Sequence, residues 1–408
     1  MAMEENIKQS REYVVIGLTD SRKPWFPPEV MAEINTARVF SGGRRHHEIV
    51  AALLPAGAEW IDITVPIDGV FDAYGHIHER IVVFASGDPL FFGFANTIRR
   101  KEPFAAIRLY PAHNSLQMLA HRMVMPYHDM CVVSLTGRPW HEFDRALIEC
   151  RPLIGVLTDR ERTPAAIARR MTEFGYDNYM MTVGCNLGNA ENESITTMTI
   201  AEAAEREFPM PNCIILTATC RRDRLFGIPD GDFEHLDGRA KMITKMPIRL
   251  LSLQALGLPS RHVLWDIGFC TGSVSIEAKA QFPHLEVVAF EKREAGEALI
   301  TANARRFGVP GIMALTGDFL QTDLSSLPCP DAVFIGGHGG RLAEIMSRVA
   351  EIMPEGGVVV MNSVTEQSRD TFVETARKLG MTLRTPLRVT ADSHNPIEIM
   401  AAEVCPVK

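Results

Sequence analysis

Two acidic residues and two glycines in the C-terminal half have the spacing of a cofactor-binding turn. Asp266 and Gly268 follow an apolar run that begins at Val263, and Gly272 comes four residues after the first glycine. Glycine allows a sharp turn without a Cβ clash, and the helix expected next points free N–H groups and partial positive charge at a ligand. Glu291 ends a second apolar run, where a carboxylate suits the two hydroxyls of a ribose. We therefore expect a nucleoside-binding βαβ unit.

The same turn favours one cofactor over another. An NAD site carries G-x-G-x-x-G, but counting from Gly268 places Cys270 and Ser273 at the later glycine positions. Asp266 can face the ammonium of a methionine moiety, whereas it would repel a pyrophosphate. Asp318 lies where enzymes that transfer the methyl group of S-adenosylmethionine usually contact adenine. S-adenosylmethionine is therefore favoured. Two alternatives stay open: a site for another nucleotide, and a glycine-rich turn that binds no ligand and only packs in the fold. Cys270 adds bulk at a position where glycine is usual.

A second set of candidate binding residues lies in the N-terminal half. The segment 86–93, Ser-Gly-Asp-Pro-Leu-Phe-Phe-Gly, directly follows an apolar run. Gly87 and Asp88 suit a tight turn, and Pro89 fixes its exit. Phe91 and its neighbour could cover a flat ligand or fill the core. A plain strand-to-helix turn explains the segment equally well.

Two arginines and two histidines follow a glycine pair in the segment 41–48, Ser-Gly-Gly-Arg-Arg-His-His-Glu. Arg44 and Arg45 could receive an anionic substrate, with a solvated helix start as the alternative. The two neighbouring histidines diverge on a helix, and no cluster of cysteines or carboxylates surrounds His76 and His78. We therefore predict no metal site.

Length, charge and cysteine usage exclude several classes of protein. A chain of 408 residues with 46% hydrophobic content suits about two or three domains with sizeable cores. A net charge of −8 argues against nucleic-acid binding, and no apolar run is long enough to span a membrane. The N-terminus lacks a signal-peptide pattern. The eight cysteines form no C-x-x-C pair, which favours a reducing cytoplasm.

Apolar runs alternate with amphipathic stretches along most of the chain, which predicts an α/β protein. The expected strands are residues 13–17, 80–85, 130–134, 153–157, 213–216, 263–267, 287–290, 332–335, 357–361 and 397–400. Helices are expected over residues 164–171 and 243–256. We predict a loose tail at 1–10, an α/β domain at 11–220, a polar linker at 221–240 and a second α/β domain at 241–408.

These pieces resemble, in order, one family over about residues 13 to 404. The N-terminal half is similar to the tetrapyrrole (class III) methylases through residues 42–46, 86–93, 114–117, 134–139, 157–159, 163–164 and 186–188. The bridge and the C-terminal half match through residues 226–230, 233–235, 243–245, 265–268, 334–337, 339–340 and 354–357. The whole chain resembles the bifunctional, decarboxylating precorrin-6Y C5,15-methyltransferases of cobalamin biosynthesis.

The resemblance implies a fold, two reactions and two cofactors. It implies a tetrapyrrole methylase domain of two α/β lobes, followed by a Rossmann-like class I methyltransferase domain, each with one S-adenosyl-L-methionine. The N-terminal domain would methylate C5 of a precorrin or cobalt-precorrin; the C-terminal domain would methylate C15 and remove the C12 acetate carboxylate. The family suggests a homo-oligomer. A methyltransferase for another tetrapyrrole or flat heterocycle, or a binding module with one inactive half, remains the alternative.

Site residues follow from the motifs and the resemblance together. The cofactor-binding candidates are Ser86, Gly87, Asp88, Pro89, Phe91, Ser115, Leu187, Thr244, Asp266, Gly268, Gly272, Glu291, Asp318, Gly336 and Gly337. The substrate-binding candidates, whose guanidinium forks match carboxylates, are Arg44, Arg45, Arg138 and Arg341.

Catalytic candidates and one departure from the family complete the expectations. Lys245 and His338 are the candidate catalytic residues of the C-terminal half; the histidine lies in a Gly-rich loop, and its ordinary pKa suits proton transfer. A histidine at the rim with no chemical role is the alternative. The family's first turn, G-x-G-x-G, keeps only Gly17 here, so we expect the loop after it to be rearranged.

Overall fold

The computed structural model describes residues 11–236, 242–390 and 396–405 and has two compact units. One unit comprises Met1–Arg138, Leu153–Ala168 and Tyr179–Ala218, and the other comprises Pro139–Pro152, Arg169–Asn178 and Thr219–Lys408. The expected tail and residues 237–240 of the expected linker lie outside the described residues. Residues 221–236 contain one short 3-10 helix, η2 (Asp230–Asp232). The linker boundaries stay a prediction.

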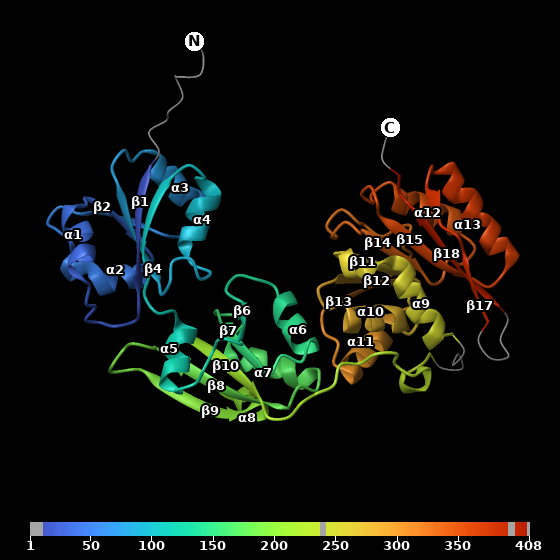
Figure 1. The fold of residues 1–408 in the computed structure, drawn as a ribbon, viewed down its shortest axis with the longest axis horizontal. Coiled ribbons are helices and arrows are strands. Elements are labelled where there is room, and N and C mark those ends of the chain that lie inside the picture. Colours follow the sequence, from blue (N-terminus) through green and yellow to red (C-terminus); the bar gives the residue numbers. More distant parts are fainter. Residues whose placement is uncertain (1–10, 237–241, 391–395, 406–408) are drawn as a thin grey trace, which may run out of the picture. The chain divides into compact units, whose positions relative to one another are not determined.

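The first sheet is parallel throughout, in the order β3-β2-β4-β1-β5 (Figure 1). Its strands are β1 (Glu12–Leu18), β2 (Val39–Gly42), β3 (Glu59–Asp62), β4 (Ile81–Ser86) and β5 (Ala106–Tyr110). The helices and 3-10 helix between them are α1 (Pro28–Thr36), α2 (Arg44–Val50), η1 (Ala51–Leu53), α3 (Asp68–Gly75) and α4 (Phe94–Lys101). Val14 and Ile16 pack with α1 and α2, while Tyr13 and Val15 pack with α3 and α4, because successive strand side chains point to opposite faces.

The second sheet is mixed, in the order β6-β7-β10-β8-β9. Its strands are β6 (Cys131–Ser134), β7 (Leu153–Leu157), β8 (Tyr179–Cys185), β9 (Ser194–Thr199) and β10 (Asn212–Ala218), and only β6 and β7 pair in parallel. The helices along this stretch are α5 (Ser115–Arg122), α6 (His141–Ile148), α7 (Pro164–Glu173) and α8 (Ile200–Ala204). Leu116 and Leu119 of α5 pack against Cys213 and Ile215 of β10.

The third sheet is parallel from β13 to β15 and antiparallel beyond, in the order β13-β12-β11-β14-β15-β18-β16, with β17 paired to β18. Its strands are β11 (Val263–Ile267), β12 (Glu286–Glu291), β13 (Ile312–Thr316), β14 (Ala332–Ile335), β15 (Val358–Ser363), β16 (Thr382–Leu383), β17 (Leu387–Val389) and β18 (Ile397–Glu403). The helices and 3-10 helix are α9 (Met246–Leu256), η3 (Leu258–Ser260), α10 (Ser273–Gln281), α11 (Ala295–Phe307), α12 (Leu342–Ala350) and α13 (Glu366–Lys378).

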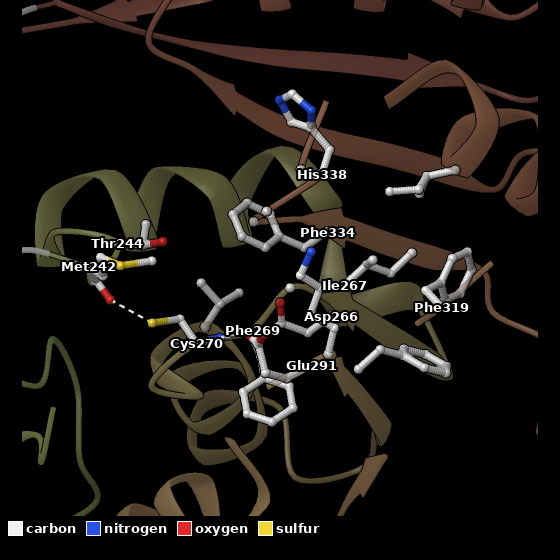
Figure 2. Close-up of a pocket in the computed structure, with 18 of the residues that line it drawn as sticks. Met242, Thr244, Asp266, Ile267, Phe269, Cys270, Glu291, Phe319, Phe334 and His338 are labelled. Carbon is white, nitrogen blue, oxygen red and sulfur yellow. Dashed lines mark hydrogen bonds between the residues drawn. The ribbon is translucent and has the colours of Figure 1, made fainter. Parts of the chain in front are cut away.

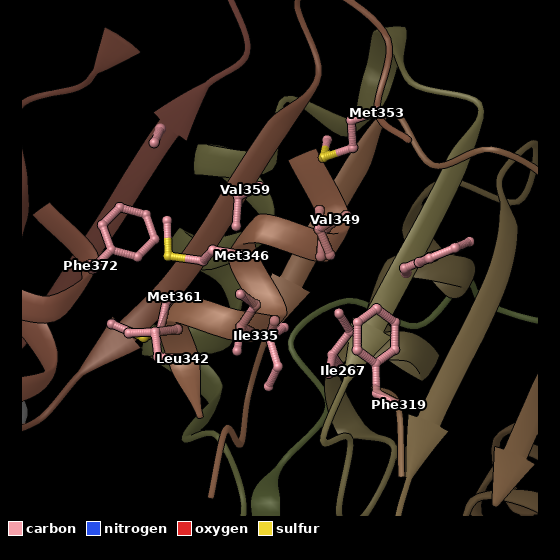
Figure 3. Close-up of a cluster of buried hydrophobic side chains, with 14 of the residues drawn as sticks. Ile267, Phe319, Ile335, Leu342, Met346, Val349, Met353, Val359, Met361 and Phe372 are labelled. Atoms are coloured by element: carbon pink, nitrogen blue, oxygen red, sulfur yellow. The ribbon is translucent and has the colours of Figure 1, made fainter. Parts of the chain in front are cut away.

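Both faces of the third sheet are buried. Ile267 of β11 belongs to one hydrophobic cluster with Met346 of α12 and Phe372 of α13 (Figure 3). Trp265 of β11 belongs to the same cluster. Leu264, on the opposite face, packs with helices α9 and α10. A strand that is covered on both faces appears in the sequence as a continuous apolar run, which explains why such strands are visible there.

All ten predicted strands and helix α7 are confirmed, and α9 begins at Met246, three residues later than expected. The strands that the sequence did not predict are β2, β3, β5, β8, β9, β13, β16 and β17. Among these, β3, β5, β9 and β13 are largely exposed or half-buried. Because such strands carry polar residues on their exposed side, a search for continuous apolar runs misses these strands.

A buried ion pair joins α9 to α10. Arg249 and Glu277 are both fully buried, with Nε and Oε2 3.2 Å apart. The glutamate also accepts hydrogen bonds from the backbone N–H groups of Gly227 and Ile228, and the arginine donates to the carbonyl of Thr244. The pair therefore holds two irregular segments against the helices.

We expect Arg249→Ala to lower the free energy of unfolding of the C-terminal unit by about 3–5 kcal/mol, because it leaves Glu277 charged and buried without its partner. Urea unfolding of the full chain measures this loss. The double variant R249M/E277Q removes both charges, keeps an acceptor for the N–H groups of Gly227 and Ile228, and should regain part of the lost stability. A double variant as unstable as Arg249→Ala would show that the ion pair is not the cause.

Candidate functional sites

A cavity of about 440 Å³ lies at the carboxyl ends of β11, β12 and β14 (Figure 2). The chain runs from β11 to β12 on one side of the sheet, whereas β14 lies on the other side of β11. This is the point where strand order reverses, and ligands of open α/β sheets bind at such points. The predicted cofactor residues that line the cavity are Thr244, Asp266, Gly268, Glu291, Asp318, Gly336 and Gly337.

Gly268 brings two loops together at the floor of this cavity. Its φ is +76°, and a Cβ there would lie 2.5 Å from the carbonyl oxygen of Gly337. Gly336 in turn donates its N–H to the carbonyl of Ile267 at 2.8 Å. Gly272, with a φ of +75°, does not line the cavity; a Cβ there would meet Ile300 at 2.3 Å. Its lack of a side chain lets α10 pack against α11, and its part in cofactor binding stays a prediction.

Asp266 is fully buried and only half-satisfied. Its Oδ2 accepts hydrogen bonds from the backbone N–H and the hydroxyl of Ser275, at 3.2 and 2.6 Å. Its Oδ1 has no hydrogen-bond partner among the described residues. Burial raises the pKa of Asp266 to about 7. An unpaired buried oxygen on a cavity wall suits a cationic ligand group such as an ammonium.

Glu291 is buried and held in place at the end of β12. Its Oε2 accepts the backbone N–H of Cys270 at 3.0 Å, and its Oε1 accepts from the backbone and guanidinium of Arg293. Each carboxylate oxygen has two acceptor sites, so Oε2 can still accept a hydroxyl. The geometry fits a ribose.

Asp318 and Arg341 line the same cavity but are bonded to each other. Asp318 accepts the N–H of Leu320 at 3.0 Å through Oδ1 and the guanidinium of Arg341 at 3.1 Å through Oδ2. Arg341 also pairs with Glu344 at 2.8 Å. The arginine that we expected to anchor a substrate carboxylate therefore already carries two carboxylates, and its role as an anchor stays a prediction.

The two catalytic candidates of this half also line the cavity. The Nδ1 of His338 accepts the backbone N–H of Gly340 at 3.2 Å, and partial burial lowers its pKa. The ring is therefore neutral near pH 7. The Nζ of Lys245 lies 3.6 Å from Oδ2 of Asp230.

Cys270 takes part in a contact that the sequence did not predict. Its φ is +54°, a region that favours glycine, and its Sγ donates to the carbonyl oxygen of Met242 at 3.0 Å (Figure 2). The thiol thus joins the cofactor turn to the segment that carries Thr244 and Lys245. The only sequence signal was a cysteine in place of the usual glycine.

Replacing Cys270 separates backbone strain from the thiol contact. Cys270→Ala keeps the strain and loses the hydrogen bond, whereas Cys270→Gly removes both. We expect the glycine variant to be more stable than the alanine variant by about 1 kcal/mol. Chemical denaturation of the full chain tests this ranking, which equal stabilities would contradict.

The N-terminal unit contains a second cavity, of about 810 Å³. The predicted residues that line it are Ser86, Gly87, Phe91, Ser115, Leu187, Arg45 and Arg138. Arg44 does not; its side chain is 93% exposed and pairs with Glu48 on the same helix. Asp88 and Pro89 are also absent from the wall. The structure thus brings together seven of these ten residues.

The geometry of the turn after β4 explains why Gly87 lines the cavity, whereas Asp88 and Pro89 do not. Gly87 has a φ of +61°, and a Cβ there would lie 2.8 Å from the Cα of Asn114. Asp88 turns back to accept the N–H of Leu90 at 2.8 Å, and Pro89 is buried. These two residues build the turn, while Gly87 lets backbone from two loops meet.

The described parts of the chain contain neither a cluster of metal-ligating side chains nor a helix that could span a membrane. Residues 11–236, 242–390 and 396–405 contain no group of three or more potential protein ligands for a metal ion. No helix within those ranges is long and apolar enough to cross a bilayer.

The C-terminal half combines a largely parallel sheet, a glycine turn at its switch point and two buried acids on the cavity wall. These features define the class of Rossmann-like methyltransferases. The precorrin methyltransferase domain family matches residues 233–401. A decarboxylating precorrin-6Y C(5,15)-methyltransferase of Sinorhizobium sp is 33% identical over 376 residues, covering 90% of this chain and 88% of that protein. The chain therefore belongs to the decarboxylating precorrin-6Y C5,15-methyltransferase family.

Other similar proteins match the whole chain or about half of it. A second protein of that name, from Mycobacterium tuberculosis, is 27% identical and covers 91% of this chain and 92% of its own. Among solved structures, a precorrin-6Y C5,15-methyltransferase from Geobacter metallireducens GS-15 is 34% identical, with a TM-score of 0.40, over 43% of this chain and 96% of its own. The predicted fold class and the prediction of a methyltransferase are confirmed by family membership.

We expect the affinity of the C-terminal site for S-adenosylmethionine to rise with pH up to about 7 and then level off. Asp266 is neutral below its pKa of about 7 and ionised above it, and only the carboxylate attracts an ammonium. The gain approaches about tenfold per pH unit below the pKa. Calorimetric titration of the full chain between pH 5.5 and 8.5 measures it. Asp266→Asn keeps the shape and should remove the dependence; a wild type without any dependence would contradict this assignment.

Proposed function

We propose that this chain methylates a precorrin at C5 in its N-terminal domain and at C15 in its C-terminal domain, where it also removes the C12 acetate carboxylate. The reactions belong to cobalamin biosynthesis, and each domain uses its own S-adenosylmethionine. One observation carries the proposal: each half has a separate cavity beside a glycine turn at the end of a parallel strand, in a chain that matches bifunctional relatives over 90% of its length.

Shorter relatives support this division of labour. A protein from Salmonella typhimurium named cobalt-precorrin-6B C(15)-methyltransferase (decarboxylating) is 37% identical and covers only 33% of this chain. A separate protein can thus carry the C15 methylation and decarboxylation. Relatives that cover nine-tenths of this chain are named for precorrin-6Y without cobalt, which favours a metal-free substrate. A homo-oligomer in the cytoplasm stays a prediction.

The residues of the C-terminal cavity can fix a cofactor at both ends. S-adenosylmethionine supplies an electrophilic methyl group on a sulfonium. Asp266 would hold the ammonium and Glu291 the ribose, so the methyl position is set by two buried carboxylates on neighbouring strands. Alignment of methyl and acceptor carbon then provides most of the rate enhancement.

Two residues of the cavity wall, Lys245 and His338, would act on the acetate and on the proton. Lys245 is partly exposed at the cavity, and its ammonium can attract a substrate carboxylate. Loss of that carboxylate leaves an electron pair in the macrocycle, which is favoured when the wall excludes water from the acetate. His338 is neutral and can accept or relay a proton.

A pair of variants tests the assignment of one reaction to each domain. Asp266→Ala should prevent C15 methylation and carbon dioxide loss, because it removes the ammonium partner. Gly87→Val should prevent C5 methylation, because its side chain would collide with Asn114. Mass spectrometry of the product should show two added methyl groups and loss of carbon dioxide for wild type, and one added methyl group for each variant.

Carbon dioxide loss distinguishes the two single-methyl products. It should accompany the methyl added by Gly87→Val and be absent with Asp266→Ala. A matched control is Gly57→Ala, since Gly57 has open space around it and does not line the cavity, although its φ of +80° costs some stability. Carbon dioxide loss from the Asp266 variant would contradict the assignment.

A further inference from the structure

Ser86, at the end of β4, is bonded to two basic side chains of α2. Its Oγ lies 3.0 Å from Nη2 of Arg45 and 2.9 Å from Nε2 of His46. All three residues line the N-terminal cavity. The question is which group donates each proton.

The histidine can only be a donor to the serine. Its Nδ1 accepts the backbone N–H of Gly43 at 3.2 Å, so Nδ1 carries a lone pair. Burial and the neighbouring Arg45 lower the pKa of His46 to about 4, so the ring is neutral at pH 7. A neutral imidazole has one N–H. The proton is therefore on Nε2, which donates to Ser86.

The serine hydroxyl can then make one more hydrogen bond, in which it is the donor. A hydroxyl offers two acceptor lone pairs and one donor proton, and the N–H groups of His46 and Arg45 occupy both lone pairs. No acceptor for its proton lies among the described residues. The donor proton is left for a ligand in the cavity, and the two donors behind it make the hydroxyl more polarised.

The charge of the cavity wall indicates the kind of acceptor. Three arginines line the described wall, Arg45, Arg100 and Arg138, whereas Asp20 is the one carboxylate there. Asp20 is buried, with Oδ1 3.6 Å from Nη1 of Arg45, and that oxygen accepts no hydrogen bond from the described residues. It keeps the guanidinium turned toward Ser86. The remaining positive charge favours an anionic acceptor.

We propose that Ser86 is a carboxylate-recognising hydrogen-bond donor of the N-terminal site, and that His46, Arg45 and Asp20 are positioning residues that aim its proton into the cavity. The inference rests on the proposed C5 methylation. The carboxylate belongs either to the amino-acid part of the cofactor or to an acetate or propionate of the tetrapyrrole, and the same chemistry recognises both.

Three variants of the full chain test the proposal through steady-state kinetics of C5 methylation. Ser86→Ala removes the donor, His46→Leu removes the group that aims it, and His46→Gln restores an N–H at the position of Nε2. We expect the first two to raise one KM tenfold or more with a smaller change in kcat, and the glutamine variant to remain near wild type. His47→Leu is the matched control. It makes the same substitution at the next position of α2, where the side chain stacks on Trp60 and does not line the cavity.

The outcomes distinguish a carboxylate of the cofactor from one of the tetrapyrrole. They also distinguish failure of the proposed role of Ser86 from failure of the proposed C5 methylation. A raised KM for S-adenosylmethionine alone identifies the carboxylate of the cofactor, and a raised KM for the tetrapyrrole alone identifies the substrate; either supports the proposal. Unchanged KM values, or equal losses for His46→Leu and His46→Gln, overturn it. A wild type that adds no methyl at C5 would instead overturn the proposed function. Thermal unfolding checks that each variant is folded.

Discussion

The close approach of two backbone segments at the carboxyl edge of the third sheet determines the C-terminal site. Gly268 and Gly337 meet so closely that any Cβ at the first would lie 2.5 Å from the carbonyl of the second. Because the loops after β11 and β14 can touch there, Asp266 ends up on a cavity wall, and Glu291 on β12 lies beside it. A side chain at Gly268 would separate these loops and open the cavity.

Buried charges in this domain have two different environments, which correspond to two roles. Glu277 has Arg249 and two backbone N–H groups as partners, so its carboxylate is compensated within the protein. Among the described residues, Asp266 has only Ser275 as a hydrogen-bond partner, and one of its oxygens accepts no hydrogen bond. An uncompensated buried carboxylate costs stability and raises the pKa. Such a cost is expected where a ligand completes the interaction.

The two halves have the same local backbone feature on two different sheets. In each, a parallel strand ends in a glycine with positive φ, and a second loop touches the backbone at that glycine: Asn114 at Gly87, and Gly337 at Gly268. In the C-terminal half, one buried acid, Asp266, precedes the turn and another, Glu291, ends the next strand. In the N-terminal half, the described wall instead carries arginines and a hydroxyl held by two donors. The two cavities therefore suit different contacts.

The amino-acid sequence by itself determined most of the buried strands, although not β2 and β8, together with the glycine turns and the acids of the C-terminal site, because continuous apolar runs and positive-φ glycines are local requirements. It could not place Arg44 in solvent, bond Arg341 to Asp318, or turn Asp88 back onto its own loop. It also could not join His46 to Ser86 or Cys270 to Met242. These contacts link residues whose distance depends on side-chain direction and loop path, and only the tertiary structure decides those.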